Sequence, residues 1–173
     1  MLDKRLIGEI IQCHIDHSDP ESFVVGQLVY FDSNWFLMQD LSSSGHWNGL
    51  ALYMLSDIVS VDECTDYIDR IKSLIKCRNK SEPFVPPISD DPLLSLLLYA
   101  KYSNRIVGLE LLASGYRDIN GTVDSLTKNT LCVHQIDEFG RADGKSYLLI
   151  DAISRCYLDD EESKCLEMLR DLV

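Results

Sequence analysis

Short apolar stretches separated by turn-forming residues make up most of this chain, and that pattern predicts β-strands joined by tight turns. In the first half we expect strands over residues 6–15, 23–31, 35–41, 50–55 and 58–61. The second half repeats the pattern over residues 106–113, 121–126, 130–136, 147–150 and 153–157. Strands this short, with turns at such regular spacing, are typical of a small β-barrel.

The expected turns carry the residues that tight turns require. Asp32-Ser33-Asn34 predicts one such turn. We expect hairpin loops over residues 45–49, where Asn48-Gly49 is a hairpin signal, and over residues 140–144 in the second half.

Three stretches have helical spacing instead of strand spacing. In the first, Asp62 is the expected N-cap. Its apolar residues recur at i, i+3, i+4 and i+7 and are Cys64, Tyr67, Ile68, Ile71, Leu74 and Ile75. The second begins after the acidic residues 159–162 and includes Cys165, Leu166, Leu169, Leu172 and Val173. The third covers residues 93–101, with Asp91 as N-cap and Pro92 at its first position, and its apolar character predicts burial.

Residues 81–92 hold four of the five prolines, which predicts an extended linker between residues 1–80 and 93–173. The two halves align without a gap at an offset of 95 residues. Identical residues then coincide at Gly26 and Gly121, Asn34 and Asn129, Gly45 and Gly140, Gly49 and Gly144, and Ile58 and Ile153. We expect a duplicated, mainly β (α+β) protein with a five-stranded barrel and a C-terminal helix in each half. The alternative is two small β-rich domains that share turn residues by chance.

The chain has 28 acidic and 16 basic residues, and its net charge of −12 opposes a general affinity for phosphate backbones or anionic lipid. Gly8-Glu9 interrupts the first apolar stretch, and the most apolar run, residues 93–100, is too short to span a membrane. We therefore expect a cytoplasmic protein. The six cysteines form no C-x-x-C pair, so we expect them to be small buried apolar residues.

Potential metal ligands are densest at Cys13, His14 and His17. On a strand, Cys13 and His17 would point to one face and His14 to the other. No convincing second pair of ligands is present, although Cys132 and His134 share a strand face, so we expect neither a metal nor another cofactor. The chain also lacks the motifs of common catalytic sites, and we expect no enzyme activity.

Binding candidates lie in the two hairpin loops. Trp47 is placed at a hairpin tip between His46 and Asn48, and Arg141 and Asp143 occupy the loop of the second half. Exposed aromatic side chains can anchor protein partners. The alternative for Trp47 is a side chain that folds back over the barrel.

Residues 26–38 resemble the first signature of Sm-like (LSm) proteins, which has a glycine, a strand ending in Asp, a tight turn and an apolar strand. The chain is also similar to Sm-like proteins of Gram-positive bacteria. Those proteins share the phrase at residues 23–26, the Gly-x-x-[Asn/Asp]-Gly loop and the ending Leu55-Ser56-Asp57-Ile58. The resemblance covers most of residues 6–75 and, more faintly, 105–157. It implies tandem Sm/SH3-like barrels in a bacterial protein.

Sm proteins bind RNA through an Asn after the first-signature turn and through an Arg-Gly pair. Phe36 and Leu131 stand at the Asn position, and Leu55-Ser56-Asp57-Ile58 replaces the Arg-Gly. The second half also has Thr127 where the signature has Asp. We therefore expect an adaptor that binds a protein partner or itself through barrel edge strands, without nucleic acid or membrane. The alternatives are an RNA-binding Sm-like regulator and an acidic immunity-type inhibitor of a basic toxin.

Overall fold

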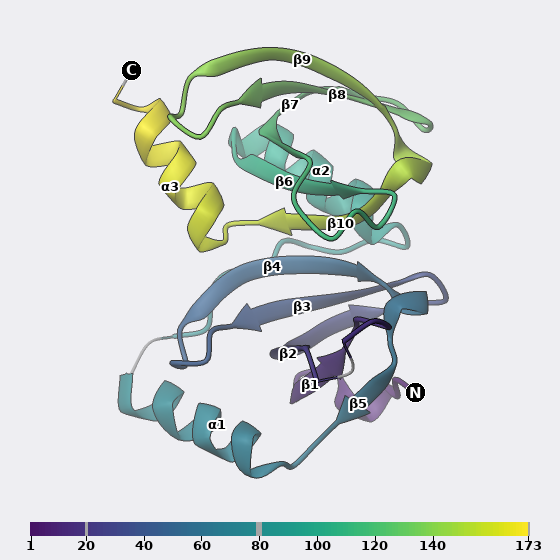
Figure 1. Ribbon diagram of the computed structural model, residues 1–173, viewed down its shortest axis with the longest axis vertical. Coiled ribbons are helices and arrows are strands. Elements are labelled where there is room, and N and C mark those ends of the chain that lie inside the picture. The colour runs from purple at the N-terminus through teal and green to yellow at the C-terminus, as the bar shows by residue number, and fades with distance from the viewer. Residues whose placement is uncertain (20, 79–80, 173) are drawn as a thin grey trace. The chain divides into compact units, whose positions relative to one another are not determined.

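A computed structural model describes residues 1–19, 21–78 and 81–172 (Figure 1). The chain forms two compact units, Met1–Val85 and Pro86–Val173, so the boundary falls within the proline-rich segment 81–92. The described residues form ten strands and three α-helices, which confirms the predicted strand-rich α+β class. No helix in these residues combines the length and the apolar composition that crossing a membrane requires.

The first unit contains a five-stranded antiparallel sheet with the strand order β5-β1-β2-β3-β4. Its strands are β1 (Ile10–His14), β2 (Phe23–Phe31), β3 (Trp35–Leu41), β4 (Trp47–Met54) and β5 (Ser60–Asp62). The predicted bounds of β2 and β3 are confirmed. β1 is shorter than the predicted 6–15, because Lys4–Leu6 forms a 3-10 turn capped by Asp3. Gly8, with φ +89°, then breaks the extended backbone.

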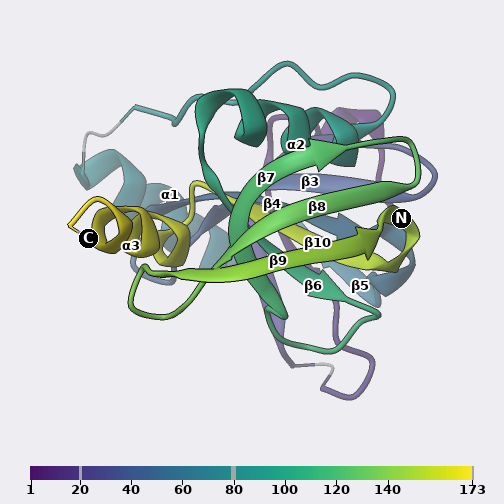
Figure 2. The same ribbon diagram turned by 90° about the horizontal axis from the view of Figure 1, so that it is seen from above.

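The second unit contains a sheet with the corresponding order β10-β6-β7-β8-β9, also antiparallel throughout. Its strands are β6 (Ile106–Leu111), β7 (Ile119–Leu126), β8 (Thr130–Ile136), β9 (Ala142–Leu149) and β10 (Ile153–Leu158). Figure 2 shows β7, β8 and β9 side by side.

The two sheets have matching registers at the offset of 95 residues. Gly26 lies opposite Asp40 in the pair β2–β3, and Gly121 lies opposite Gln135 in β7–β8. Both pairs have an irregularity at the same place, after Leu28 and after Val123. The next pairs also match, since Trp35 lies opposite Met54 and Thr130 lies opposite Leu149.

The hairpin loops lie earlier in the chain than predicted. Backbone hydrogen bonds from Ser42 to His46 and from Asp137 to Arg141 close the loops, so the predicted loop positions 47–49 and 142–144 belong to β4 and β9. Gly49, at φ +76°, lies where the β3–β4 register shifts. The Asn-Gly pair therefore forms a β-bulge instead of a turn, because a bulge also needs a residue with positive φ.

Helix α2 (Pro92–Ser103) begins as predicted, with the Asp91 carboxylate accepting a hydrogen bond from the Leu94 N–H. Its buried face packs mainly against β7. Helix α3 (Glu161–Arg170) is capped by Asp160. Leu172 lies past the end of α3 and is exposed, contrary to the prediction, and Val173 lies outside the described residues.

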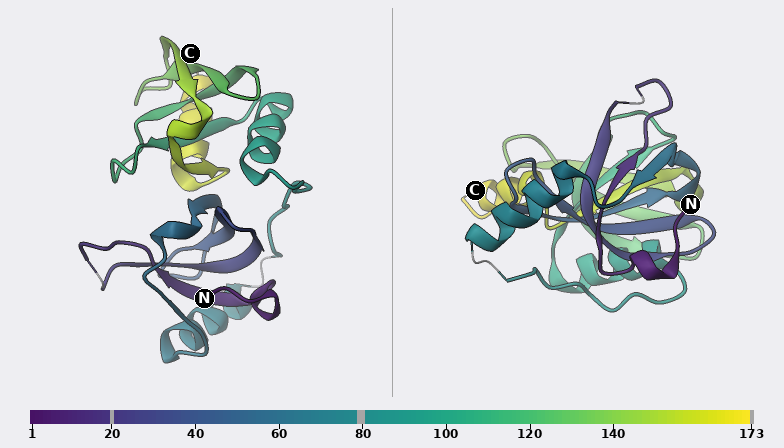
Figure 3. Two further views of the ribbon diagram at one scale, coloured as in Figure 1. Left: turned by 90° about the vertical axis from the view of Figure 1, so that its right-hand side faces the viewer. Right: turned by 90° about the horizontal axis from the view of Figure 1, so that it is seen from below.

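Helix α1 (Asp66–Arg78) begins later than predicted. The Thr65 hydroxyl accepts a hydrogen bond from the Ile68 N–H, whereas Asp62 is the last residue of β5, so the predicted Asp62 cap is wrong. Cys64 is also not part of the helix, because it precedes α1 with φ +58° and is exposed. Figure 3 shows α1 beside the first sheet, where Ile71 packs in its core.

Candidate functional site

Trp47 is not at an exposed hairpin tip, because it is the first residue of β4 and is half-buried. Its ring packs against a core cluster of Val25, Leu41 and Ile71, which is the folded-back alternative. The indole N–H is buried and has no hydrogen-bond partner among the described residues. His46 is exposed in the loop before β4.

Asn48 is half-buried in the β4 bulge and lines a hollow together with Phe23, Asp40 and Tyr67. Asn48 is therefore a first-unit candidate that borders a hollow. No charged side chain from α1 is among the residues that line it.

Arg141 and Asp143 are both exposed at the start of the second hairpin. The Arg141 guanidinium stacks on Phe139 at 4.7 Å from the ring centre and donates to Asp137 at 3.0 Å. The Arg141 backbone N–H, which also donates to Asp137, is the main reason why the pKa of Asp137 lies below its usual value. These contacts organise the hairpin, and they do not join Arg141 to Asp143.

Cys13, His14 and His17 do not converge. Cys13 is fully buried, and burial, with smaller contributions from Asp40 and Asp62, raises the pKa of its thiol to about 12. His14 Nε2 lies 3.1 Å from an Asp62 carboxylate oxygen, while His17 is exposed in the following turn. No group of three or more His, Cys, Asp or Glu side chains among the described residues is arranged to hold a metal ion.

The cysteines differ in accessibility. The prediction that they are buried is confirmed for Cys13, Cys132 and Cys156 and is wrong for Cys64 and Cys77, which are exposed, while Cys165 is half-buried. Cys64 precedes α1, and Cys77 lies in its last turn. We expect these two thiols to react rapidly with a disulfide reagent at pH 8. Cys13 and Cys156 should react only after unfolding, since burial raises the pKa of each to about 12.

The control for this titration is the double variant Cys64→Ser/Cys77→Ser, which should lose the rapid phase. Rapid reaction of Cys13 or Cys156 in the folded chain would contradict the buried positions of both thiols.

Positions that correspond to the RNA-contacting Asn of Sm proteins are inside the core. Phe36 has 0 % and Leu131 has 1 % of its surface exposed. The turns before these positions have the same hydrogen-bond pattern in the two units. Asp32 accepts hydrogen bonds from two backbone N–H groups of the first turn, and the Thr127 hydroxyl accepts the equivalent two in the second.

One exposed apolar surface was missed by the sequence reasoning. On β9, Tyr147 is 79 % and Leu149 is 64 % exposed, and both side chains lie on one face of the strand. Within its unit, β9 has a hydrogen-bonded neighbour, β8, on one side only. At the matching positions of the first unit, Leu52 is fully buried and Met54 is half-buried. The apolar residues were visible in the sequence, but their exposure was not.

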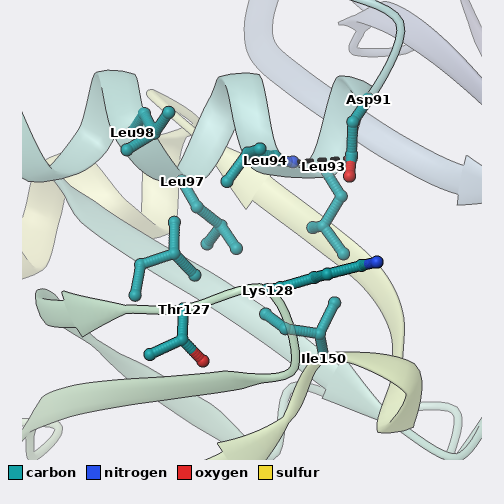
Figure 4. Close-up of a pocket in the computed structure, with 9 residues that line it drawn as sticks. Asp91, Leu93, Leu94, Leu97, Leu98, Thr127, Lys128 and Ile150 are labelled. Carbon is teal, nitrogen blue, oxygen red and sulfur yellow. Dashed lines mark hydrogen bonds between the residues drawn. The ribbon is translucent and has the colours of Figure 1, made fainter.

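The second unit also contains an apolar pocket of about 310 Å³ between α2 and the β7–β8 turn (Figure 4). Its walls are formed by six aliphatic side chains: Leu93, Leu94, Leu97, Leu98, Leu126 and Ile150. Lys128, from the turn, also lines the pocket and lies between α2 and Ile150 in the close-up.

Comparison with protein-family models, curated proteins and solved structures finds no match for the chain. The fold by itself identifies the class of protein: the described residues form an α+β protein with two five-stranded units of matching register. Two features of the second unit are open to a partner or ligand, namely the β9 edge and the α2 pocket.

Proposed function

We propose that this chain is a tandem duplication of an Sm-like small barrel and acts as a non-catalytic binding protein. Three observations support the duplication: the common strand order, the matching registers and the bulges at equivalent positions. Matching bulges are informative because a bulge changes which face every later side chain points to. A duplicated chain would retain both the register and the bulge positions.

The partner is a protein that adds to the β9 edge, and a second copy of this chain is the partner we test. The exposed apolar pair Tyr147 and Leu149 carries this proposal. An open strand edge offers unpaired backbone donors and acceptors, and apolar side chains beside it gain free energy when a partner covers them. Native proteins often protect such edges with charge or proline, and the same face of β9 carries Asp143 and Lys145, the latter paired with Asp124. Tyr147 and Leu149, at the end of the strand, are the part of that face that is apolar and exposed.

Light scattering coupled to size-exclusion chromatography tests the proposal. We expect the wild-type chain to form an oligomer at high micromolar concentration. The double variant Tyr147→Lys/Leu149→Lys should be a monomer, because two charged side chains on the edge disfavour strand addition. The mass of the wild-type oligomer gives the number of copies.

The matched control is Tyr102→Ser, which removes an aromatic side chain that is 82 % exposed at the end of α2, away from β9. This variant should associate like the wild type. Two results together would refute the proposal. The wild-type chain would stay monomeric, and its pull-down would retain no protein that is missing from the pull-down with the β9 double variant.

A further inference from the structure

We infer that the α2 pocket binds a short aliphatic carboxylate, of the chemical class of medium-chain fatty acids. The side chains that form the pocket walls indicate that the ligand has an alkyl tail, because all six are leucine or isoleucine and none is aromatic. A volume of about 310 Å³ lies at the lower end of the range, roughly 300–1,000 Å³, that small-molecule pockets occupy. An unbranched alkyl chain of modest length therefore matches both the size and the chemistry of the interior.

The polar groups at the pocket indicate the head group. Asp91 borders the pocket at the start of α2, where one of its carboxylate oxygens accepts the Leu94 N–H, and the Thr127 hydroxyl contacts the Thr130 hydroxyl and two backbone N–H groups. Lys128 is exposed in the turn and forms no ion pair with another described residue. Its ammonium group is the one cation among the residues that line the pocket, and it attracts an anion.

A corresponding pocket in the first unit shows what is particular to the second. Phe31, Asp32 and Leu55 line a hollow of about 230 Å³, and they occupy the positions of Leu126, Thr127 and Ile150.

The two pockets differ in charge at the turn that borders them. Asp32-Ser33 in the first unit corresponds to Thr127-Lys128 in the second, which replaces one negative charge with one positive charge. Both hollows are apolar, but only the second has a cation in its turn. The carboxylate selectivity should therefore be confined to the second unit.

Methyl NMR spectroscopy of the full chain, titrated with octanoate, tests this inference. We expect saturable shifts of the Ile150 methyl groups, while the Ile58 methyl groups, at the first-unit pocket, remain unshifted. Octanoate should bind about tenfold more tightly than octanol, the difference that one charge-assisted hydrogen bond provides.

Lys128→Met is the decisive variant, because it keeps most of the apolar stem and removes the charge at an exposed position. It should reduce the affinity for octanoate to that for octanol. Lys164→Met removes an exposed lysine on α3, outside the pocket, and should leave both affinities unchanged.

Any of four results would overturn the inference. The first is equal affinity for octanoate and octanol in the wild type, and the second is an unchanged octanoate affinity in Lys128→Met. The third is the absence of saturable shifts at Ile150 below the concentration at which octanoate forms micelles. Tighter binding of octylammonium than of octanoate would also overturn it, since Asp91 would then select the head group.

Discussion

Replacing Gly121 with alanine is expected to destabilise the second unit by about 3 kcal/mol, because the new methyl group would collide with the His134 carbonyl group on the neighbouring strand. Gly26→Ala should have a similar effect in the first unit, where the methyl carbon would lie 2.5 Å from the Gln39 carbonyl oxygen. Both obstacles are backbone atoms of a paired strand, so side-chain rotation cannot relieve the clash. The two glycines occupy equivalent positions in β2 and β7.

Urea unfolding separates the two effects. Both tryptophans, Trp35 and Trp47, lie in the first unit, so tryptophan emission reports on that unit, whereas circular dichroism reports on both. Gly26→Ala should shift the emission curve to lower urea, and Gly121→Ala should shift the circular dichroism curve.

Gly8→Ala is the control for these substitutions. Gly8 has φ +89°, but nothing lies within 4 Å of the added carbon, so only the backbone cost of about 1 kcal/mol is expected. If Gly26→Ala and Gly121→Ala cost no more than Gly8→Ala, the close strand approach at both positions is wrong.

Arg117→Met is expected to destabilise the second unit by about 3 to 5 kcal/mol, since it leaves a buried carboxylate without its counter-charge. The Arg117 and Asp160 side chains form an ion pair in which they are only 14 % and 7 % exposed, respectively. The Arg117 guanidinium also lies over the Tyr157 ring, 4.4 Å from its centre. A side chain at position 108 would collide with this guanidinium, so Gly108 provides the space for it.

Loss of the Arg117–Asp160 ion pair should reduce stability first in the segments that this pair joins. Asp160 caps α3, so hydrogen exchange in Arg117→Met should accelerate first in α3 and in β6. Arg141→Met is the matched control, because the Arg141–Asp137 pair is a solvent-exposed contact within one hairpin. A loss of stability in Arg141→Met as large as that in Arg117→Met would show that burial of the charge is not the cause.

Local signals in the sequence were sufficient where the structure depends on near neighbours. Asp91-Pro92 predicted the start of α2, and the turn at Asp32-Ser33-Asn34 fixed the end of β2 and the start of β3. These features involve hydrogen bonds between residues a few positions apart, so they can be predicted from the chain itself.

Local signals were ambiguous where one residue type serves two structures. Asn48-Gly49 is suited to a hairpin turn and to a β-bulge, since both need positive φ, and the register of β3 with β4 decides for the bulge. Asp62 and Thr65 are both good N-caps. The pairing of Asp62 with Gln12 on β1 retains Asp62 in β5 and leaves Thr65 to cap α1.

The sequence by itself determined the strand-rich α+β class and the start of α2. It also determined the central residues of most strands and the repeat at an offset of 95 residues. Only the tertiary structure decided that Tyr147 and Leu149 are exposed, whereas Leu52, at the position that matches Tyr147, is buried. It also decided that the leucines of α2 border a pocket beside Lys128. The physical reason is that alternation in a sequence assigns side chains to two faces of a strand or helix. Which face is covered depends on segments that are distant in the chain.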